Sequence, residues 1–271
     1  MGDTTTEGRP TFARHAAAFG GGGAIGALGG LIGLGGAEFR LPLLISAFRF
    51  NALEAVILNK AMSLIVVASA LPFRMTTVPL SDVAANWPII LNLLAGSVAG
   101  AWFGAGWATR LKSETLYRVI AVLLVGIAAV LLFGHDPDAA GNPLITGTLQ
   151  AVAGVVAGFA VGVVASLMGV AGGELLIPTI ILLFGVDVKL AGSLSLAVSL
   201  PTMITGFARY SRDQTFAVVA RNRAFLLVMA AGSVIGAFIG AQLVGVIPAS
   251  FLLPVLALIL AISAVKVWSH Q

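Results

Sequence analysis

Three charged side chains stand inside otherwise apolar stretches of this chain, at Glu38, Arg40 and Lys60. A charge within a bilayer is costly, so such residues are usually functional or paired with one another. A buried cation can bind an anion, and a carboxyl removed from water can hold a proton. These residue types therefore indicate anion binding, and they leave proton coupling open as a second role.

The glycine-rich stretch that carries Glu38 and Arg40 occurs twice. "GLGGAEFRLP" begins at Gly33, and "GVAGGELLIP" begins 136 positions later, with Glu174 in the place of Glu38. The two carboxylates have two interpretations. They can complement the dipoles of helix starts, or they can form a protonatable pair that couples anion movement to protons. The first is favoured, because both copies keep the residue and an anion site gains little from two carboxylates.

The repeat extends over the whole chain. The second half aligns on the first at a constant offset of 136, and "AGSVAGAWFGA" (95–105) matches "AGSVIGAFIGA" (231–241) at eight of eleven positions. We therefore divide the chain into a flexible tail (1–13), a first membrane repeat (14–135), an external linker (136–149) and a second membrane repeat (150–271).

Composition places these repeats in a membrane. Hydrophobic residues make up 59% of the 271 positions and charged residues 10%, whereas soluble domains carry about 25% charged residues. The absence of cysteine excludes a thiol nucleophile and a cysteine metal site, and the three histidines are too scattered to bind a metal. No span carries a nucleophile with a base, so we expect no enzyme, no cofactor and no nucleic-acid partner.

Apolar segments of spanning length predict the elements. A spanning helix needs about 20 apolar residues. We expect spans at 52–73, 88–109 and 116–134 in the first repeat, and at 188–208, 224–245 and 251–268 in the second. The preceding segments, 15–48 and 151–184, are too long for one span, and we interpret each as a helix, a break and a short second helix. The fold class is an all-α integral membrane protein with two inverted repeats of about five elements each.

Loop charge predicts the inversion. Cytoplasmic loops are rich in Lys and Arg. The loop 110–118 is basic while its counterpart 246–254 has no basic residue, and 209–223 holds four arginines while 73–87 holds one. Equivalent loops of the two repeats thus have opposite charge bias, which indicates that the repeats are inverted in the membrane. With the basic loops in the cytoplasm, both termini are cytoplasmic as well. The alternative, four spans per repeat in parallel orientation, would place the arginine-rich loop outside.

Inverted repeats with broken helices are typical of secondary transporters, whose broken elements meet near the midplane of the membrane. The short helices would begin near Ala37 and Gly173 and aim positive N-termini at an anion, with Pro42 and Pro178 in their first turns. The substrate site is predicted to comprise Gly35, Gly36, Ala37, Glu38, Arg40, Asn59, Lys60, Ser63, Ala171, Gly172, Gly173, Glu174, Ser193, Ser195 and Ser199.

Three of these residue groups have an alternative role. Lys60 either binds the anion directly or pairs with Glu38 or Glu174, and Arg40 either neutralises Glu38 or contacts substrate. The serine hydroxyls between 193 and 199 either solvate the anion or pack helices together.

The paired pattern G-x-x-G-x-x-x-x-x-P, followed by "AGSLSLAVSLP" (191–201), resembles the TauE/SafE sulfite exporter family of membrane permeases. This resemblance implies export of sulfite, or of an organosulfonate such as sulfoacetate, across the bacterial inner membrane. The chain departs from the pattern at Ala37, where a glycine is usual, at the charged Glu38 and Arg40, and at Asn59-Lys60. A transporter of another small anion such as a carboxylate, or a proton-coupled carrier that uses Glu38 and Glu174, is the alternative.

Overall fold

The computed structural model describes residues 11–32, 36–75, 79–133, 143–242 and 249–269, and every element in them is helical. The elements are α1 (Thr11–Ile32), α2 (Ala37–Ser46), α3 (Ala52–Met75), α4 (Leu80–Ala85), α5 (Trp87–Ala108), α6 (Ser113–Phe133), α7 (Gly147–Met168), α8 (Gly173–Phe184), α9 (Val188–Tyr210), the 3-10 helix η2 (Gln214–Phe216), α10 (Ala217–Arg221), α11 (Arg223–Gln242) and α12 (Ala249–Trp268).

Helix starts recur at the offset that the sequence repeat predicts. The helices α1, α2, α3, α5 and α6 begin 136 residues before α7, α8, α9, α11 and α12, respectively. The first helices begin at Thr11 and Gly147, three residues before the repeat boundaries expected at 14 and 150. Within the described residues, five stretches are long and apolar enough to cross a membrane: Ala52–Ala70, Trp87–Ala108, Gly147–Met168, Lys189–Tyr210 and Arg223–Gly240.

The broken first segment of each half is confirmed as a helical hairpin. The break before α8 needs glycine, because Gly169 and Gly172 have φ angles of 68° and 82°, and Gly36 before α2 has 65°. The short helix α8 then runs back along α7, so that the Gln150 side chain reaches the carbonyl of Leu183. In the first half, α2 runs back along α1 in the same way, with Leu43 beside Gly21.

Two features of the connections differ from expectation. Pro42 and Pro178 are each the sixth residue of their short helices rather than members of the first turn, because the helices already begin at Ala37 and Gly173, directly after the left-handed Gly36 and Gly172. Each proline therefore lacks the N–H that would bond the carbonyl four residues earlier, at Glu38 or Glu174. The loops expected at 73–87 and 209–223 contain the short helices α4 and α10. The sequence did not predict these helices because neither contains an apolar stretch long enough to span a membrane.

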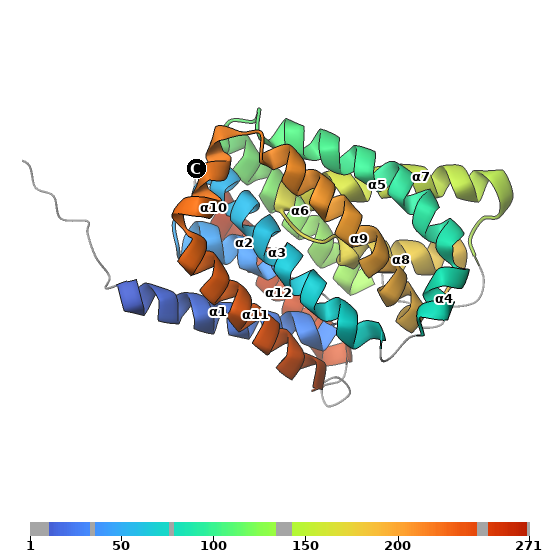
Figure 1. Ribbon diagram of the computed structural model, residues 1–271, viewed down its shortest axis with the longest axis horizontal. Helices are drawn as coiled ribbons and strands as arrows, with labels where there is room; N and C mark the ends of the chain where they lie inside the picture. Colours follow the sequence, from blue (N-terminus) through green and yellow to red (C-terminus); the bar gives the residue numbers. More distant parts are fainter. Residues whose placement is uncertain (1–10, 33–35, 76–78, 134–142, 243–248, 270–271) are drawn as a thin grey trace, which may run out of the picture.

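Close packing through small residues joins the two halves. Helix α1 packs on α11 and α5 on α7, and Figure 1 shows these pairs at opposite ends of the molecule. A Cβ at Gly236 would overlap the backbone of Gly23, and one at Gly100 would overlap Phe159, so the helix backbones touch. Such contacts are typical of membrane helices.

Helices α3 and α9 lie between these pairs and contact each other. They are equivalent elements of the two halves, and Figure 1 shows them running in opposite directions. This arrangement supports an inverted repeat, while the placement of either half relative to a bilayer stays a prediction.

Candidate anion site

Arg40 is the centre of a buried polar cluster. Helix α2 starts after the left-handed Gly36 and carries the Arg40 side chain into the interior, where it is 0% exposed. The guanidinium donates to Asn59 Oδ1 at 2.8 Å, Ser63 Oγ at 2.7 Å and Ser233 Oγ at 3.1 Å. All three acceptors are neutral, so these hydrogen bonds solvate the cation without cancelling its charge.

Asn59 and Ser63, on α3, connect Arg40 to the helix breaks. Asn59 accepts from Arg40 through its oxygen and donates through Nδ2 to the carbonyls of Ala37 at 2.9 Å and Met168 at 3.1 Å. Ser63 donates to the carbonyl of Gly169 at 3.3 Å. The start of α2 and the end of α7 are thus held together by the polar face of α3.

Lys60 lies one residue along α3 and is also fully buried. Its Nζ donates to the carbonyls of Ala165 and Val170, both at 3.1 Å, where α7 ends and the break begins. A helix C-terminus carries partial negative charge and attracts a cation. Within the described ranges Lys60 does not form the salt bridge to Glu38 or Glu174 that the sequence analysis left open.

Glu38 and Glu174 are the second residues of α2 and α8, and they are 0% and 4% exposed. The two carboxyls are neighbours in the interior, and the described structure shows no hydrogen bond between them. Among the described residues, neither oxygen of Glu38 and only one oxygen of Glu174 can have a hydrogen-bond partner. A bond between the two carboxyls requires a proton on one of them, because an ionised carboxylate is only an acceptor.

The second half repeats the scaffold of this cluster without its cations. Leu176 stands at the position equivalent to Arg40, Leu196 at that of Lys60, and Ser199 at that of Ser63. Ser199 Oγ is buried and has no hydrogen-bond partner in the described part of the chain. The hydroxyls of Ser193 and Ser195 bond to carbonyls of their own helix, at 3.4 Å and 2.9 Å. The positive groups are therefore concentrated on one side of the site.

The remaining predicted site residues belong to the two breaks. Ala37, at the start of α2, is buried, and its carbonyl accepts from Asn59. Ala171 packs in a small cluster with Val67 and Met203, and Gly172 caps the start of α8 at Gly173. Gly35 lies outside the described residues. Direct contact of any of these residues with a substrate stays a prediction.

Two serines of the cluster were missed by sequence reasoning. Ser233 accepts from Arg40 and donates to the carbonyl of Met229 at 3.0 Å. Ser233 belongs to the "AGSV" stretch, whose small residues indicate close helix packing. The signal that could have identified it is that both copies of the stretch contain the serine, and the equivalent Ser97 is also hydrogen-bonded, to Thr202 at 2.7 Å. Ser166 is buried near Lys60, and its hydroxyl has no partner in the described ranges.

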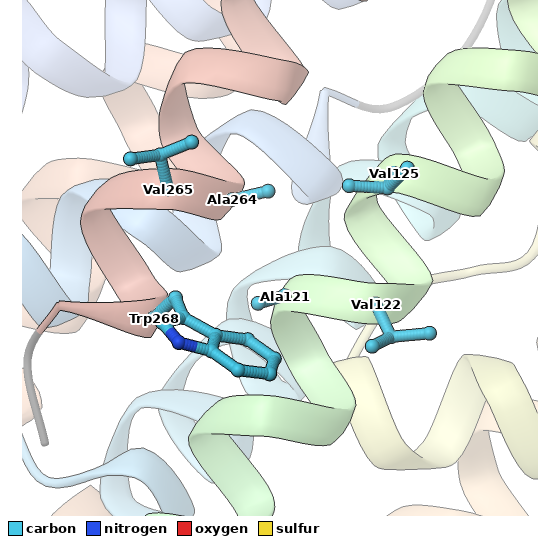
Figure 2. A pocket seen from close by; sticks show the side chains of 6 residues that line it. All are labelled: Ala121, Val122, Val125, Ala264, Val265 and Trp268. Atoms are coloured by element: carbon cyan, nitrogen blue, oxygen red, sulfur yellow. The ribbon is translucent and has the colours of Figure 1, made fainter.

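Two hollows of the described structure lie away from this cluster. The first has a volume of about 310 Å³ and lies between α6 and α12. Its lining, drawn in Figure 2, is almost entirely apolar and consists of Ala121, Val122, Val125, Ala264, Val265 and Trp268. A second, of about 270 Å³, lies where α5 and α9 end. Neither includes a residue of the Arg40 cluster. Because Glu38, Arg40, Asn59 and Lys60 are all fully buried, the cluster is closed to solvent in this conformation.

An all-α chain with apolar helices of spanning length around a buried ionic cluster is an integral membrane protein of the solute-transporting kind. Residues 18–267 match the model of the sulfite exporter TauE/SafE family, and the chain belongs to that family of membrane transporters. No curated protein and no solved structure matched the chain.

Proposed function

We propose that this protein is a secondary transporter that exports a small sulfur-containing anion, sulfite or an organosulfonate such as sulfoacetate, by alternating access. It would lie in the bacterial cytoplasmic (inner) membrane with both termini in the cytoplasm. Membership of the sulfite exporter family supports the substrate class. The observation that carries the proposal is the pair of fully buried cations, Arg40 and Lys60, neither in a salt bridge within the described ranges.

The anion would bind where the two helix breaks meet. Arg40 is close to the start of α2, and a helix start offers free N–H groups and partial positive charge to an anion. A guanidinium presents five N–H donors in a fork that suits an oxyanion, and three of its nitrogens already hold the site together. The sulfur oxyanion would replace one or more of these neutral acceptors.

Release of the anion follows from the same contacts. An unpaired buried charge is strongly unfavourable, so a site that left Arg40 bare would hold its anion too tightly. Asn59, Ser63 and Ser233 take over the guanidinium when the anion leaves. This substitution supports rapid turnover and an occluded conformation without substrate.

A second candidate function rests on the two facing carboxyls. Glu38 and Glu174 are buried as neighbours, and in the described part of the chain both oxygens of Glu38 and one oxygen of Glu174 have no hydrogen-bond partner. Two like charges this close are unfavourable together in a low-dielectric interior, so a proton shared by the pair would stabilise them. In this version the proton moves with or against the anion, and the carrier is proton-coupled.

Flux measurements in proteoliposomes test the proposal. Sulfite, sulfoacetate and acetate are compared as substrates, with Arg40→Leu, which copies Leu176, and Lys60→Ala as variants. Lys266→Ala is the matched control, because Lys266 is exposed at the end of α12. We expect sulfur anions to be preferred and both cluster variants to be impaired. Equal sulfite flux in wild type and both cluster variants, or a preference for acetate, would contradict the proposal.

A further inference from the structure

The hollow of about 270 Å³ at the ends of α5 and α9 combines aromatic and basic side chains. Its lining is Trp102, Phe103, Gly106, Trp107, Arg110 and Arg209. Arg209 is near the end of α9 and Arg110 just follows α5. The two helices run in the same direction, since Ser97 contacts Thr202 and Gly106 contacts Arg209, so both basic groups lie at one face of the membrane domain.

The arginines are held over a tryptophan ring. The guanidinium carbon of Arg212 is 4.8 Å from the centre of the Trp102 ring, and that of Arg209 is 5.6 Å from it. Arg209 also occupies the space over Gly106, where an added Cβ would lie 3.1 Å from its Nε. Cation–π contact orients guanidinium groups without consuming their N–H donors. These donors therefore remain able to bind an anion.

No carboxylate neutralises this basic rim within the described ranges. None of Arg110, Arg209 and Arg212 forms a salt bridge among the described residues. The acid nearest in sequence, Asp213, uses a carboxylate oxygen to cap η2, accepting from the N–H of Thr215 at 2.8 Å. The rim thus presents a net positive charge.

Below the rim the surface is apolar and exposed. Trp102, Phe103 and Trp107 are 40%, 57% and 42% exposed, although each is a large hydrophobic side chain. Aromatic side chains are enriched where a membrane protein meets the headgroup region, because one end is apolar and the other borders water. The repeat does not copy this combination, since Phe73 and Thr76 stand at the first-half positions equivalent to Arg209 and Arg212.

We propose that this hollow binds one anionic phospholipid, with its phosphate on Arg209, Arg212 and Arg110 and an acyl chain along Phe103 and Trp107. Basic pockets between membrane helices bind anionic headgroups, and the attraction of each basic side chain is substantial at low ionic strength. A soluble anion would use the rim but would leave the exposed rings uncovered. A zwitterionic lipid would cover the rings but would gain little from the arginines.

Lipid titration of the purified full chain tests this proposal. The protein in neutral detergent is titrated with phosphatidylglycerol, phosphatidylcholine or inorganic phosphate, and bound lipid and thermal stability are measured by native mass spectrometry and melting. We expect phosphatidylglycerol to bind preferentially and to raise the melting temperature. The double variant Arg209→Gln/Arg212→Gln should bind it roughly thirtyfold more weakly, the product of two basic residues' contributions.

Arg223→Gln is the matched control, because Arg223 is exposed at the start of α11 and belongs to the same loop region. It removes one positive charge by the same Arg→Gln change, outside the hollow, and should leave lipid binding unchanged. Trp102→Leu keeps an apolar surface but removes the cation–π support, and it should weaken phosphatidylglycerol binding alone. Equal binding of both lipids, stabilisation by phosphate alone, or an equal loss in Arg223→Gln would overturn the proposal.

Discussion

The guanidinium of Arg40 lies 3.1 Å from the hydroxyl oxygen of Ser233, although 193 positions separate the two residues in the chain. Arg40 is on the short helix of the first half, and Ser233 is on α11 of the second, which packs against α1. The contact therefore connects the charged centre of one half to a helix of the other. A movement that separates the halves must break it or replace it by another acceptor, such as a bound anion.

The Ser233→Ala variant tests this relationship. It removes one of three acceptors and leaves a donor of a buried cation unsatisfied, which costs about 1–3 kcal/mol. We expect a lower melting temperature without substrate and a larger stabilisation by sulfite, because the anion supplies the missing acceptor. The measurement is melting in detergent with and without sulfite, and Ser97→Ala, at the equivalent position, is the control. An equal rise in melting temperature with sulfite in both variants would show that Arg40 takes no part in binding the anion.

Lys60 can be tested against a purely structural role. Lys60→Leu copies Leu196 and removes two hydrogen bonds from the end of α7, so it should destabilise the protein by about 1–3 kcal/mol. If Lys60 also attracts the substrate, the KM for sulfite should rise roughly tenfold, as expected for the loss of a charged partner. A lower melting temperature with unchanged KM would assign Lys60 to helix capping alone.

The helix pairs could be predicted from sequence only in part. Spanning segments can be predicted from the length of the apolar stretches. The offset of 136 residues then predicts where each equivalent helix of the second half begins. The breaks follow from glycine, which alone adopts the left-handed angles at Gly169 and Gly172 without strain. The short helices α4 and α10 did not follow, because neither shows an apolar stretch of spanning length.

The charged cluster was less predictable than the fold. Sequence identifies Arg40 and Lys60 as unusual because a charge in a span is rare, but it does not say which carbonyls or hydroxyls they meet. Lys60 meets the end of α7 because α3 crosses that break, and such a crossing depends on packing of helices more than 100 positions apart. The contact of Ser233 with Arg40 was not predicted, because serine occurs in close helix packing as well as in hydrogen bonding.

Close backbone contact between α1 and α11 predicts a contrast between two glycines. Gly236→Leu would force a side chain into the backbone of Gly23, so we expect severe loss of folded protein and a cost above about 3 kcal/mol. Gly126→Ala on α6 has open space around the added carbon and should be neutral or stabilise by up to about 1 kcal/mol. Yield of monodisperse protein and melting temperature measure both. A tolerated Gly236→Leu would show that the two helices separate freely.

Single-cysteine labelling tests the orientation, since the chain has no cysteine of its own. Lys112 follows α5 and Arg212 follows α9, and these parallel helices end at one face, whereas Ser81 on α4 precedes α5. We expect Lys112→Cys and Arg212→Cys to resist an impermeant maleimide in intact cells and Ser81→Cys to react. Labelling of Arg212→Cys but not Lys112→Cys would favour parallel repeats, which place the arginine-rich loop 209–223 outside.

Proton coupling depends on the pair Glu38 and Glu174, and Glu38→Gln separates its two interpretations. If the two carboxyls form a protonatable pair, the amide keeps the shape of the side chain and supplies N–H donors to the neighbouring carboxyl, so stability should rise. If the pair carries protons, sulfite movement in the variant should no longer change the pH inside vesicles, as reported by an entrapped indicator, even where sulfite flux persists.

Glu114→Gln is the control for this measurement, because Glu114 is exposed in the first turn of α6. If the carboxylates only complement the helix starts, Glu38→Gln loses that favourable charge and melts slightly lower, with the pH change per sulfite equal to that of wild type. The two interpretations thus predict opposite changes in stability and different proton movement.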